Sequence, residues 1–139
     1  MNSGVNIFKN VFFLLICLNF TCFAVFAQQE VSDEAILKMD ELDDKPIYLG
    51  TTSFLTEVQK HMRLPEVDQD IDVLVEVQFV IETNGTISNL KCTKDPGFGF
   101  CQNALKAVKS IKPGWKPGVK YGKPVRTEFV MPLRIKIKP

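Results

Sequence analysis

Apolar and polar residues alternate without a break from Val125 to Ile137. The odd positions are apolar apart from Thr127, whereas most even positions are charged. This period of two predicts a β-strand with one buried face and one face in water. Pro132 falls among the even positions, and proline has no N–H to give to a ladder. The strand is therefore predicted to lie at the edge of its sheet.

The same proline predicts which side of this strand is open. Consecutive residues turn their backbone N–H and C=O groups to opposite sides, so the odd residues are predicted to bond inward to a neighbouring strand. The even residues are predicted to present their backbone groups to the free edge: Arg126, Glu128, Val130 and Arg134. An unpaired edge is a liability unless something covers it or unless its purpose is binding. These residues are therefore the candidate binding site.

Two more strands are predicted upstream. Residues 73–82 alternate in the same way and run into Asn84-Gly85, one of the strongest short hairpin signals. The return strand is predicted over residues 86–93. The apolar residues of this segment change parity once, which predicts either a β-bulge or a late start of the strand.

Apolar residues at helical spacing mark two helices. One helix is predicted to start at residues 51–53 and to end at Leu64-Pro65, and a second spans about residues 100–111. The order of elements is therefore helix, strand, strand, helix, strand. With a right-handed crossover, this order predicts an α+β fold. Its three-stranded antiparallel sheet has the strand order second, first, third, and the helices pack on one face.

The first part of the chain has the pattern of a targeting segment. Residues 1–27 combine one basic residue, an apolar run and small residues near their end, which predicts a secretory signal peptide cleaved after Ala27. The alternative is an uncleaved inner-membrane anchor that faces the periplasm, because the apolar run is long enough to span a bilayer. Residues 28–50 are predicted to form an acidic, mobile leader with a short helix around residues 34–42. The folded domain is then expected in the periplasm, over residues 51–139.

The net charge adds little to this picture, but the distribution of charged residues along the chain is informative. The formal net charge is +1, which predicts neither a nucleic acid nor a membrane surface as a partner. Residues 28–72 hold twelve acidic and four basic residues, whereas residues 73–139 hold four acidic and twelve basic ones. We interpret the acidic leader as a shield for the field of the basic domain.

Residue types that carry catalysis or bind metals are sparse. His61 is the only histidine and has no cluster of carboxylates or thiols beside it in the sequence. No metal site, cofactor or catalytic triad is therefore predicted. Gly97 and Gly99 lack the third glycine of a phosphate-binding loop. The sequence favours a binding protein over an enzyme.

Cysteines and the single tryptophan add two structural expectations. Cys17 and Cys22 lie in the predicted signal peptide, whereas Cys92 and Cys101 lie in the folded domain. Because export leads to an oxidising compartment, the pair Cys92 and Cys101 is predicted to form a disulfide. Trp115 is predicted to fill the core rather than to stack on a ligand.

Several of these segments together resemble one known family. The resemblance is carried by Val75-Glu76-Val77-Gln78-Phe79-Val80, Asn84-Gly85, Ala104-Leu105-Lys106-Ala107-Val108, Trp115-Lys116-Pro117-Gly118, Gly122-Lys123-Pro124-Val125 and Met131-Pro132-Leu133. Over Gly50 to Ile137 the chain resembles the C-terminal domain of TonB-type energy transducers. The resemblance implies a structural role for residues of the closing motif: Trp115, Gly118, Gly122 and Pro124.

Members of this family pair a β-strand with the TonB-box peptide of an outer-membrane receptor and pass on energy from the proton-motive force. The resemblance therefore implies a periplasmic module that binds a TonB-box-like peptide by β-strand addition, in TonB-dependent transport. The alternative is a solitary envelope adaptor or structural protein without energy transduction. It would use the same edge to bind another envelope protein or a second copy of itself, as a homodimer.

Overall fold

The computed structural model describes residues 32–138. The predicted signal peptide, residues 1–27, and the first residues of the predicted leader lie outside this part of the chain. Within residues 32–138, no helix is both long enough and apolar enough to cross a membrane.

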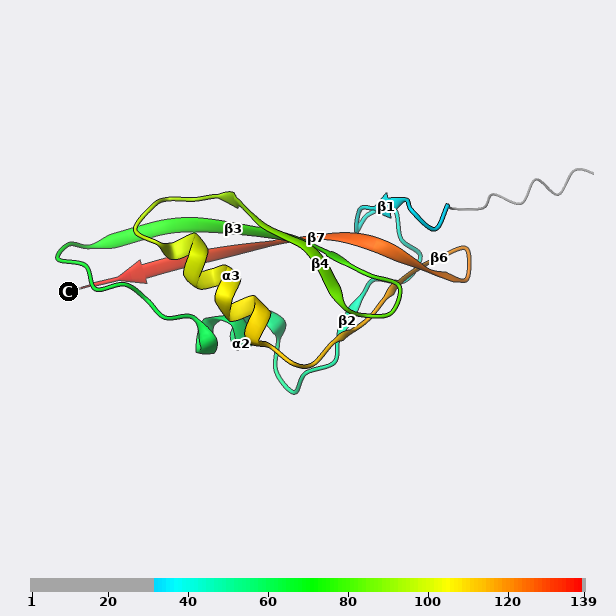
Figure 1. Cartoon of the computed structure of the whole chain (residues 1–139), viewed down its shortest axis with the longest axis horizontal. Coiled ribbons are helices and arrows are strands. Elements are labelled where there is room, and N and C mark those ends of the chain that lie inside the picture. The colour runs from blue at the N-terminus through cyan, green and yellow to red at the C-terminus, as the bar shows by residue number, and fades with distance from the viewer. Residues whose placement is uncertain (1–31, 139) are drawn as a thin grey trace, which may run out of the picture. The chain divides into compact units, whose positions relative to one another are not determined.

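Two long antiparallel strands form the centre of the main sheet (Figure 1). Strand β3 spans Ile71–Ile81 and strand β7 spans Lys123–Ile137. Their register runs from Ile71 opposite Ile137 to Ile81 opposite Thr127. The odd residues of β7 from Val125 to Ile135 are buried or half-buried, which confirms the predicted period of two.

Strand β4, Ile87–Lys94, pairs with the other side of β3 after a tight turn at Asn84-Gly85. Its pairing shifts register between Gln78 and Val80 of β3, where β4 carries one extra residue. Asn89 lies in this irregular part with a φ of 50°. The predicted bulge is therefore confirmed, since an extra residue on one strand of a pair is what defines it.

The main sheet has more strands than the three predicted. The α+β class is confirmed, but β7 also pairs with a parallel strand β1 (Ile36–Leu37) and with an antiparallel strand β6 (Gly118–Lys120). The path of hydrogen-bonded strands is β1-β7-β3-β4, with β6 beside the start of β7. A second, two-stranded sheet joins β2 (Ile47–Tyr48) to β5 (Trp115–Lys116).

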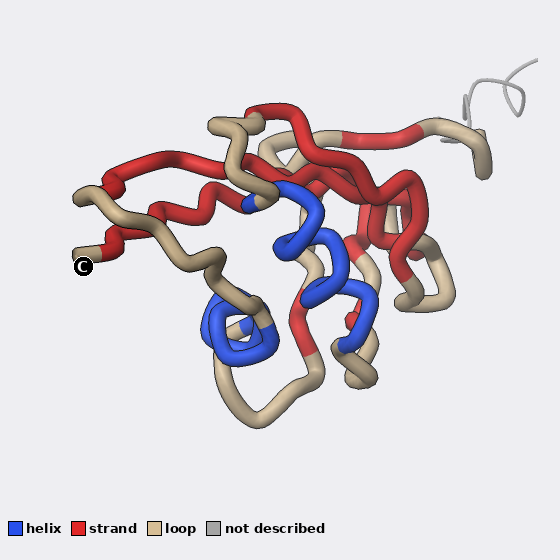
Figure 2. The backbone as a smooth tube through the Cα atoms, turned by 60° about the vertical axis from the view of Figure 1, so that its left-hand side comes forward, coloured by secondary structure: helices blue, strands red, loops and turns tan. Residues whose placement is uncertain are grey.

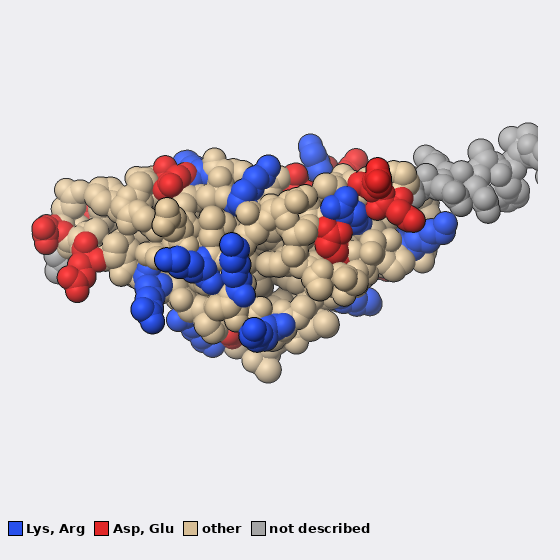
Figure 3. Space-filling view, in the orientation of Figure 1, with Lys and Arg blue, Asp and Glu red and all other residues tan. Residues whose placement is uncertain are grey.

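Both helices lie on the same side of the main sheet (Figure 2). Helix α2 spans Phe54–His61, and its N-cap Ser53 accepts a hydrogen bond at Oγ from the backbone N–H of Thr56 at 3.2 Å. Helix α3 spans Phe100–Ser110. Basic side chains gather over α3 in the space-filling view (Figure 3).

The core between helices and sheet is built around a cluster of aromatic rings. Trp115 is buried, and its ring centroid lies 5.0 Å from that of Phe54 and 5.1 Å from that of Phe129. Phe129 in turn stacks on Phe79 at 5.1 Å, and Tyr48 lies 5.4 Å from Trp115. Rings from helix α2 and from strands β2, β3 and β7 therefore meet at the tryptophan.

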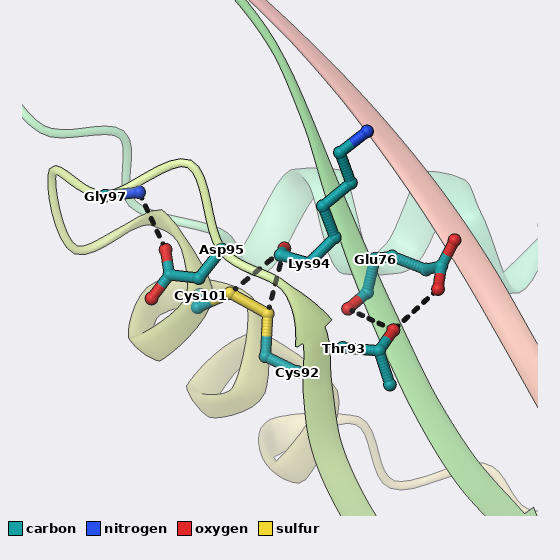
Figure 4. The surroundings of a disulfide bond; sticks show 7 residues. All are labelled: Glu76, Cys92, Thr93, Lys94, Asp95, Gly97 and Cys101. Atoms are coloured by element: carbon teal, nitrogen blue, oxygen red, sulfur yellow. Dashed lines mark hydrogen bonds between the residues drawn. A yellow bond between two sulfur atoms is a disulfide. The ribbon is translucent and has the colours of Figure 1, made fainter.

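A disulfide joins Cys92 and Cys101, as predicted (Figure 4). It ties the end of β4 to the first turn of α3, with 5.9 Å between the two Cα atoms. The Lys94 carbonyl oxygen lies 3.3 Å from Cys92 Sγ and 3.4 Å from Cys101 Sγ. Asp95 Oδ1 accepts a hydrogen bond from the Gly97 N–H at 2.8 Å and so closes the turn between the two cysteines.

The prediction of a mobile leader with a short helix is wrong for residues 32–50. These residues contain β1 and β2, and Asp44 forms an antiparallel bridge with Val119 of β6. The physical reason lies in apolar residues scattered through the acidic sequence. Leu42 contacts the domain closely at Gly118, and Pro46 is buried. The folded domain therefore begins before residue 51.

Candidate functional site

The outer edge of β7 is the candidate site, and Pro132 sets the direction of its backbone groups. Pro132 lies opposite Glu76 of β3. Because proline has no N–H, this pair cannot exchange the two hydrogen bonds of a hydrogen-bonded antiparallel pair. The Glu76 carbonyl instead accepts from Thr93 Oγ1 of β4 at 3.4 Å. The even residues of β7 therefore turn their backbone groups away from β3, as the sequence predicts.

Most of this outer edge is free. In the part of the chain that the structure describes, no strand pairs with the outer side of β7 from Glu128 to Ile137. Val130 lies in the middle of this segment and is 44% exposed. We call residues 128–137 with their outward backbone groups the open edge.

Arg126 was predicted to belong to the free edge, and this prediction is wrong. Ile36 of β1 lies opposite Arg126, and Leu37 lies opposite Thr127, so the leader covers this end of β7. The sequence pattern could not indicate this, because two apolar residues in an acidic segment carry no pairing signal. The other predicted residues, Glu128 and Val130, lie on the open edge together with Arg134.

The side chain of Arg126 fixes the leader at this place. Its Nη1 donates to the Glu34 carbonyl oxygen at 3.2 Å. Its Nε and Nη2 donate to the Glu82 carboxylate at 2.8 and 3.0 Å. This bidentate bond, with a second bond from Ser88, holds the pKa of Glu82 below its ordinary value. The guanidinium thus binds both the leader and Glu82, the residue that follows β3.

A second contact holds the leader farther along the chain. The Asp43 carboxylate accepts from the backbone N–H of Tyr121 at 2.7 Å and from Lys120 Nζ at 3.0 Å. These two bonds lower the pKa of Asp43. The backbone of residues 43–44 also exchanges hydrogen bonds with Val119, for example from the Val119 N–H to the Asp44 carbonyl at 2.9 Å. We call this set of contacts the Asp43 clamp.

Three residues of the closing motif shape the turn that leads into β7. Tyr121 and Gly122 have φ angles of 50° and 73°, the pair of positive values found in a type I′ hairpin turn. A Cβ at Gly118 would lie 2.7 Å from Thr127 Oγ1 and 2.8 Å from Leu42 Cδ1. Gly118 therefore lets the leader and β7 approach each other. Pro124 lies beside this turn, where it faces Val119.

A groove adjoins the open edge near its C-terminal end. It has a volume of about 250 Å³. Its lining comes from the end of α2, the following link and β7: Gln59, Met62, Leu64, Leu133, Arg134, Ile135 and Lys136. No residue of β3 lines it, so it opens on the side of β7 that carries the free backbone groups. The sequence did not predict this groove, because Met62 was interpreted as part of the apolar face of the first helix and Leu64 as its end.

Two cations on the opposite face of the sheet share one carboxylate next to this groove. Asp72 accepts from Arg134 at Nε and Nη2, at 2.9 and 3.0 Å, and Lys136 Nζ lies 3.6 Å away. The bonds from Arg134 lower the pKa of Asp72, so this carboxylate is ionised at neutral pH. One positive charge therefore remains in excess at this end of the open edge.

The remaining predicted residues lie away from the edge. The disulfide Cys92–Cys101 belongs to β4, the strand farthest from the open edge in the path of strands. Trp115 lies in the core beneath β7. The disulfide and the buried tryptophan therefore lie apart from the backbone groups of the open edge.

The fold defines a small α+β module whose last strand, in the described part of the chain, has no strand paired with its outer side over residues 128–137. The family model described as the Gram-negative bacterial TonB protein C-terminal matches residues 66–137, just over half of the chain. The chain belongs to this family, which confirms the resemblance seen in the sequence. Among curated proteins, none matches the chain significantly. The matched residues include β7 and its open edge but exclude the leader, with β1 and Asp43.

Proposed function

We propose that the open edge of β7 binds an extended peptide segment of an envelope protein by β-strand addition in the periplasm. The expected partner is the TonB-box-like segment of an outer-membrane receptor, in TonB-dependent transport. One observation carries the proposal: β7 already accepts an added strand, β1, on this side. Strand β1 lies outside the residues that match the family, so this side of β7 pairs with a strand that precedes the matched part of the chain.

The chemistry of the open edge fits this role. Every even residue from Glu128 to Lys136 offers a carbonyl oxygen, and all except Pro132 offer an N–H. Main-chain bonds to such groups give affinity in β-strand addition, and side-chain pockets give specificity. Because the odd residues of β7 are packed in the core, the edge is rigid before the partner arrives, which lowers the entropic cost of binding.

A second candidate function is an adaptor that binds through the same edge without energy transduction. The folded leader favours it. Only the residues between Ala27 and Ile36 could act as a tether, and such a segment reaches about 30 Å when fully extended. With an uncleaved anchor, the domain would stay close to the inner membrane. Intact mass of the protein from envelope fractions separates the two functions, because a chain that begins at Gln28 favours the adaptor.

Amide hydrogen exchange tests the binding mode directly. In the free protein, we expect the amides of Phe129 and Met131 to be protected and those of Val130 and Arg134 to exchange fast. Addition of a TonB-box peptide should protect the even amides and leave the odd ones unchanged. Protection of both sets in the free protein would contradict the open edge.

Proline substitution provides the matched pair of variants. Val130→Pro should leave a folded domain that no longer binds the peptide, because the substitution removes an outward N–H. Phe129→Pro should unfold the domain, because it removes an N–H of the β3–β7 ladder. Val130→Ala keeps the N–H and serves as the control, with unchanged binding. If Val130→Pro unfolds the protein as badly as Phe129→Pro does, the proposed binding mode is wrong.

A further inference from the structure

We propose that the open edge selects peptides with the order apolar, acidic, apolar, placed opposite Leu133, Arg134 and Ile135. The inference rests on the proposed function and deepens it, because it names the side chains that the edge reads. The groove beside α2 takes the two apolar side chains, and the cation pair Arg134–Lys136 takes the carboxylate.

The first step is the position of the groove. Leu133 and Ile135 point to the helix side of the sheet, where both are buried. Met62 and Leu64 face them from the end of α2 and its link, and Leu64 is 52% exposed. No residue of β3 lines the groove, so a strand added to the open edge is expected to pass beside these two residues.

The second step is the pleat of the sheet. Side chains of paired residues in adjacent strands point to the same face, and consecutive residues alternate between faces. The peptide residues opposite Leu133 and Ile135 therefore point into the groove. The residue between them, opposite Arg134, points to the other face of the sheet. An apolar surface that is already hollowed favours apolar side chains at the two inward positions.

The third step is charge. On the outward face, Arg134 and Lys136 share the single carboxylate of Asp72. All three side chains are about half exposed or more, so a further ion pair here adds modest affinity. It discriminates strongly by sign, however, because a lysine between the two apolar residues would meet a net positive charge.

The leader does not occupy this part of the edge. Strand β1 ends at Leu37, opposite Thr127, and the described chain then turns away toward the Asp43 clamp. The first β7 residue that lines the groove is Leu133. The sequence of β1, Ile36-Leu37, also lacks an acidic residue between apolar ones. The groove is therefore available to a segment of another protein while β1 stays in place.

Three synthetic peptides test the inference on the chain that begins at Gln28. They share a capped Ser/Thr-rich frame and differ only at the centre: Leu-Glu-Leu, Leu-Lys-Leu or Ser-Glu-Ser. By calorimetric titration, we expect Leu-Glu-Leu to bind at least about tenfold more tightly than Ser-Glu-Ser, because two apolar side chains lose their contact with water. Leu-Lys-Leu should bind about three- to tenfold more weakly than Leu-Glu-Leu, and this gap should shrink at high salt.

Variants of the protein assign each preference to its residues. Leu64→Ser should abolish the preference for Leu-Glu-Leu over Ser-Glu-Ser, whereas Leu55→Ser, on α2 but outside the groove, should keep it. In the double variant Arg134→Gln and Lys136→Gln, the carboxylate of Asp72 is left without a cation, so Leu-Lys-Leu should bind at least as tightly as Leu-Glu-Leu. The side chains of Leu64, Arg134 and Lys136 are exposed, so these variants are expected to fold.

The outcomes separate the inference from the proposed function. If the three peptides bind with equal affinity and Val130→Pro abolishes binding, the edge binds peptides but the groove and the cations contribute no selectivity. A preference that survives in Leu64→Ser overturns the role of the groove. If no peptide binds and TonB-box segments also fail, the proposed function fails and the inference fails with it.

Discussion

Replacement of Trp115 by alanine should remove much of the stability of the domain, because its ring is the centre of the aromatic cluster. The side chain is 7% exposed. Four rings contact it, with centroid distances from 5.0 to 6.1 Å. Its backbone is fixed independently of the ring, since the Trp115 N–H donates to the Gly85 carbonyl at 2.9 Å. The backbone at Trp115 is therefore held in place, so the cavity left by the substitution cannot easily close.

Two routes give similar magnitudes for this loss. A tryptophan buries about 200 Å² of surface, which at about 25 cal/mol per Å² corresponds to about 5 kcal/mol. Measured Phe/Trp→Ala substitutions in protein cores cost about 3–5 kcal/mol, including the cavity that remains. We therefore expect about 4 kcal/mol, a large part of the 5–15 kcal/mol that stabilises an ordinary domain. Trp115→Phe should lose less, because it keeps most of the ring contacts.

Urea unfolding followed by far-UV circular dichroism measures the change in the free energy of unfolding. Fluorescence does not serve, because the chain has a single tryptophan. Lys116→Ala is the control on the adjacent, exposed position of β5 and should change stability by less than about 0.5 kcal/mol. A loss below about 1.5 kcal/mol in Trp115→Ala, with the disulfide intact, would refute the core role. Normal stability with lost peptide binding would instead place Trp115 in the binding site.

Three shorter predictions concern the disulfide, the closing turn and the Asp43 clamp. Replacing Cys92 and Cys101 by serine should lower the free energy of unfolding by about 2.5 kcal/mol on the chain-entropy model, as measured by chemical unfolding. Two free thiols in the unfolded, unreduced mature chain would contradict the disulfide. Gly118→Ala should cost about 1–3 kcal/mol by overpacking, whereas Gly122→Asn, in open space at positive φ, should cost less than about 1 kcal/mol. Asp43 has a lowered pKa, so its stabilising effect is complete above the unfolded pKa and is lost as pH falls through the folded pKa. Between about pH 5 and pH 2, the wild type should therefore lose more stability than Asp43→Asn, and parallel curves would contradict the clamp.

Strands β3 and β7 could be predicted from the sequence because two local signals coincide there. Each alternates with a period of two, and Asn84-Gly85 fixes the turn that pairs β3 with β4. Pro132 even indicates the direction of the backbone groups, since the lack of an N–H is a property of the residue and needs no tertiary context. The open side of β7 can thus be predicted from the sequence of that strand alone.

The leader could not be predicted in the same way. Strands β1 and β2 have two residues each, too few for any periodicity, and they lie in a segment with many acidic residues. Their pairing depends on contacts distant in sequence, such as the bond from Arg126 to the Glu34 carbonyl. The groove escaped prediction for a related reason. Met62 and Leu64 form it only because α2 ends above β7, and the crossing of two elements is not a local property of either.

Strand β7 divides its residues between the core and the open edge. Phe129 and Met131 point into the core, and their backbone groups bond to β3, so any change there alters folding. The side chains of Val130, Pro132 and Arg134 point away from the core, and their backbone groups point away from β3. A partner strand can therefore join or leave the edge without repacking the core. Substitutions at the exposed even residues and at Leu64 are therefore expected to cost little stability, whereas the odd residues, including Leu133 and Ile135 of the groove, are constrained by the fold.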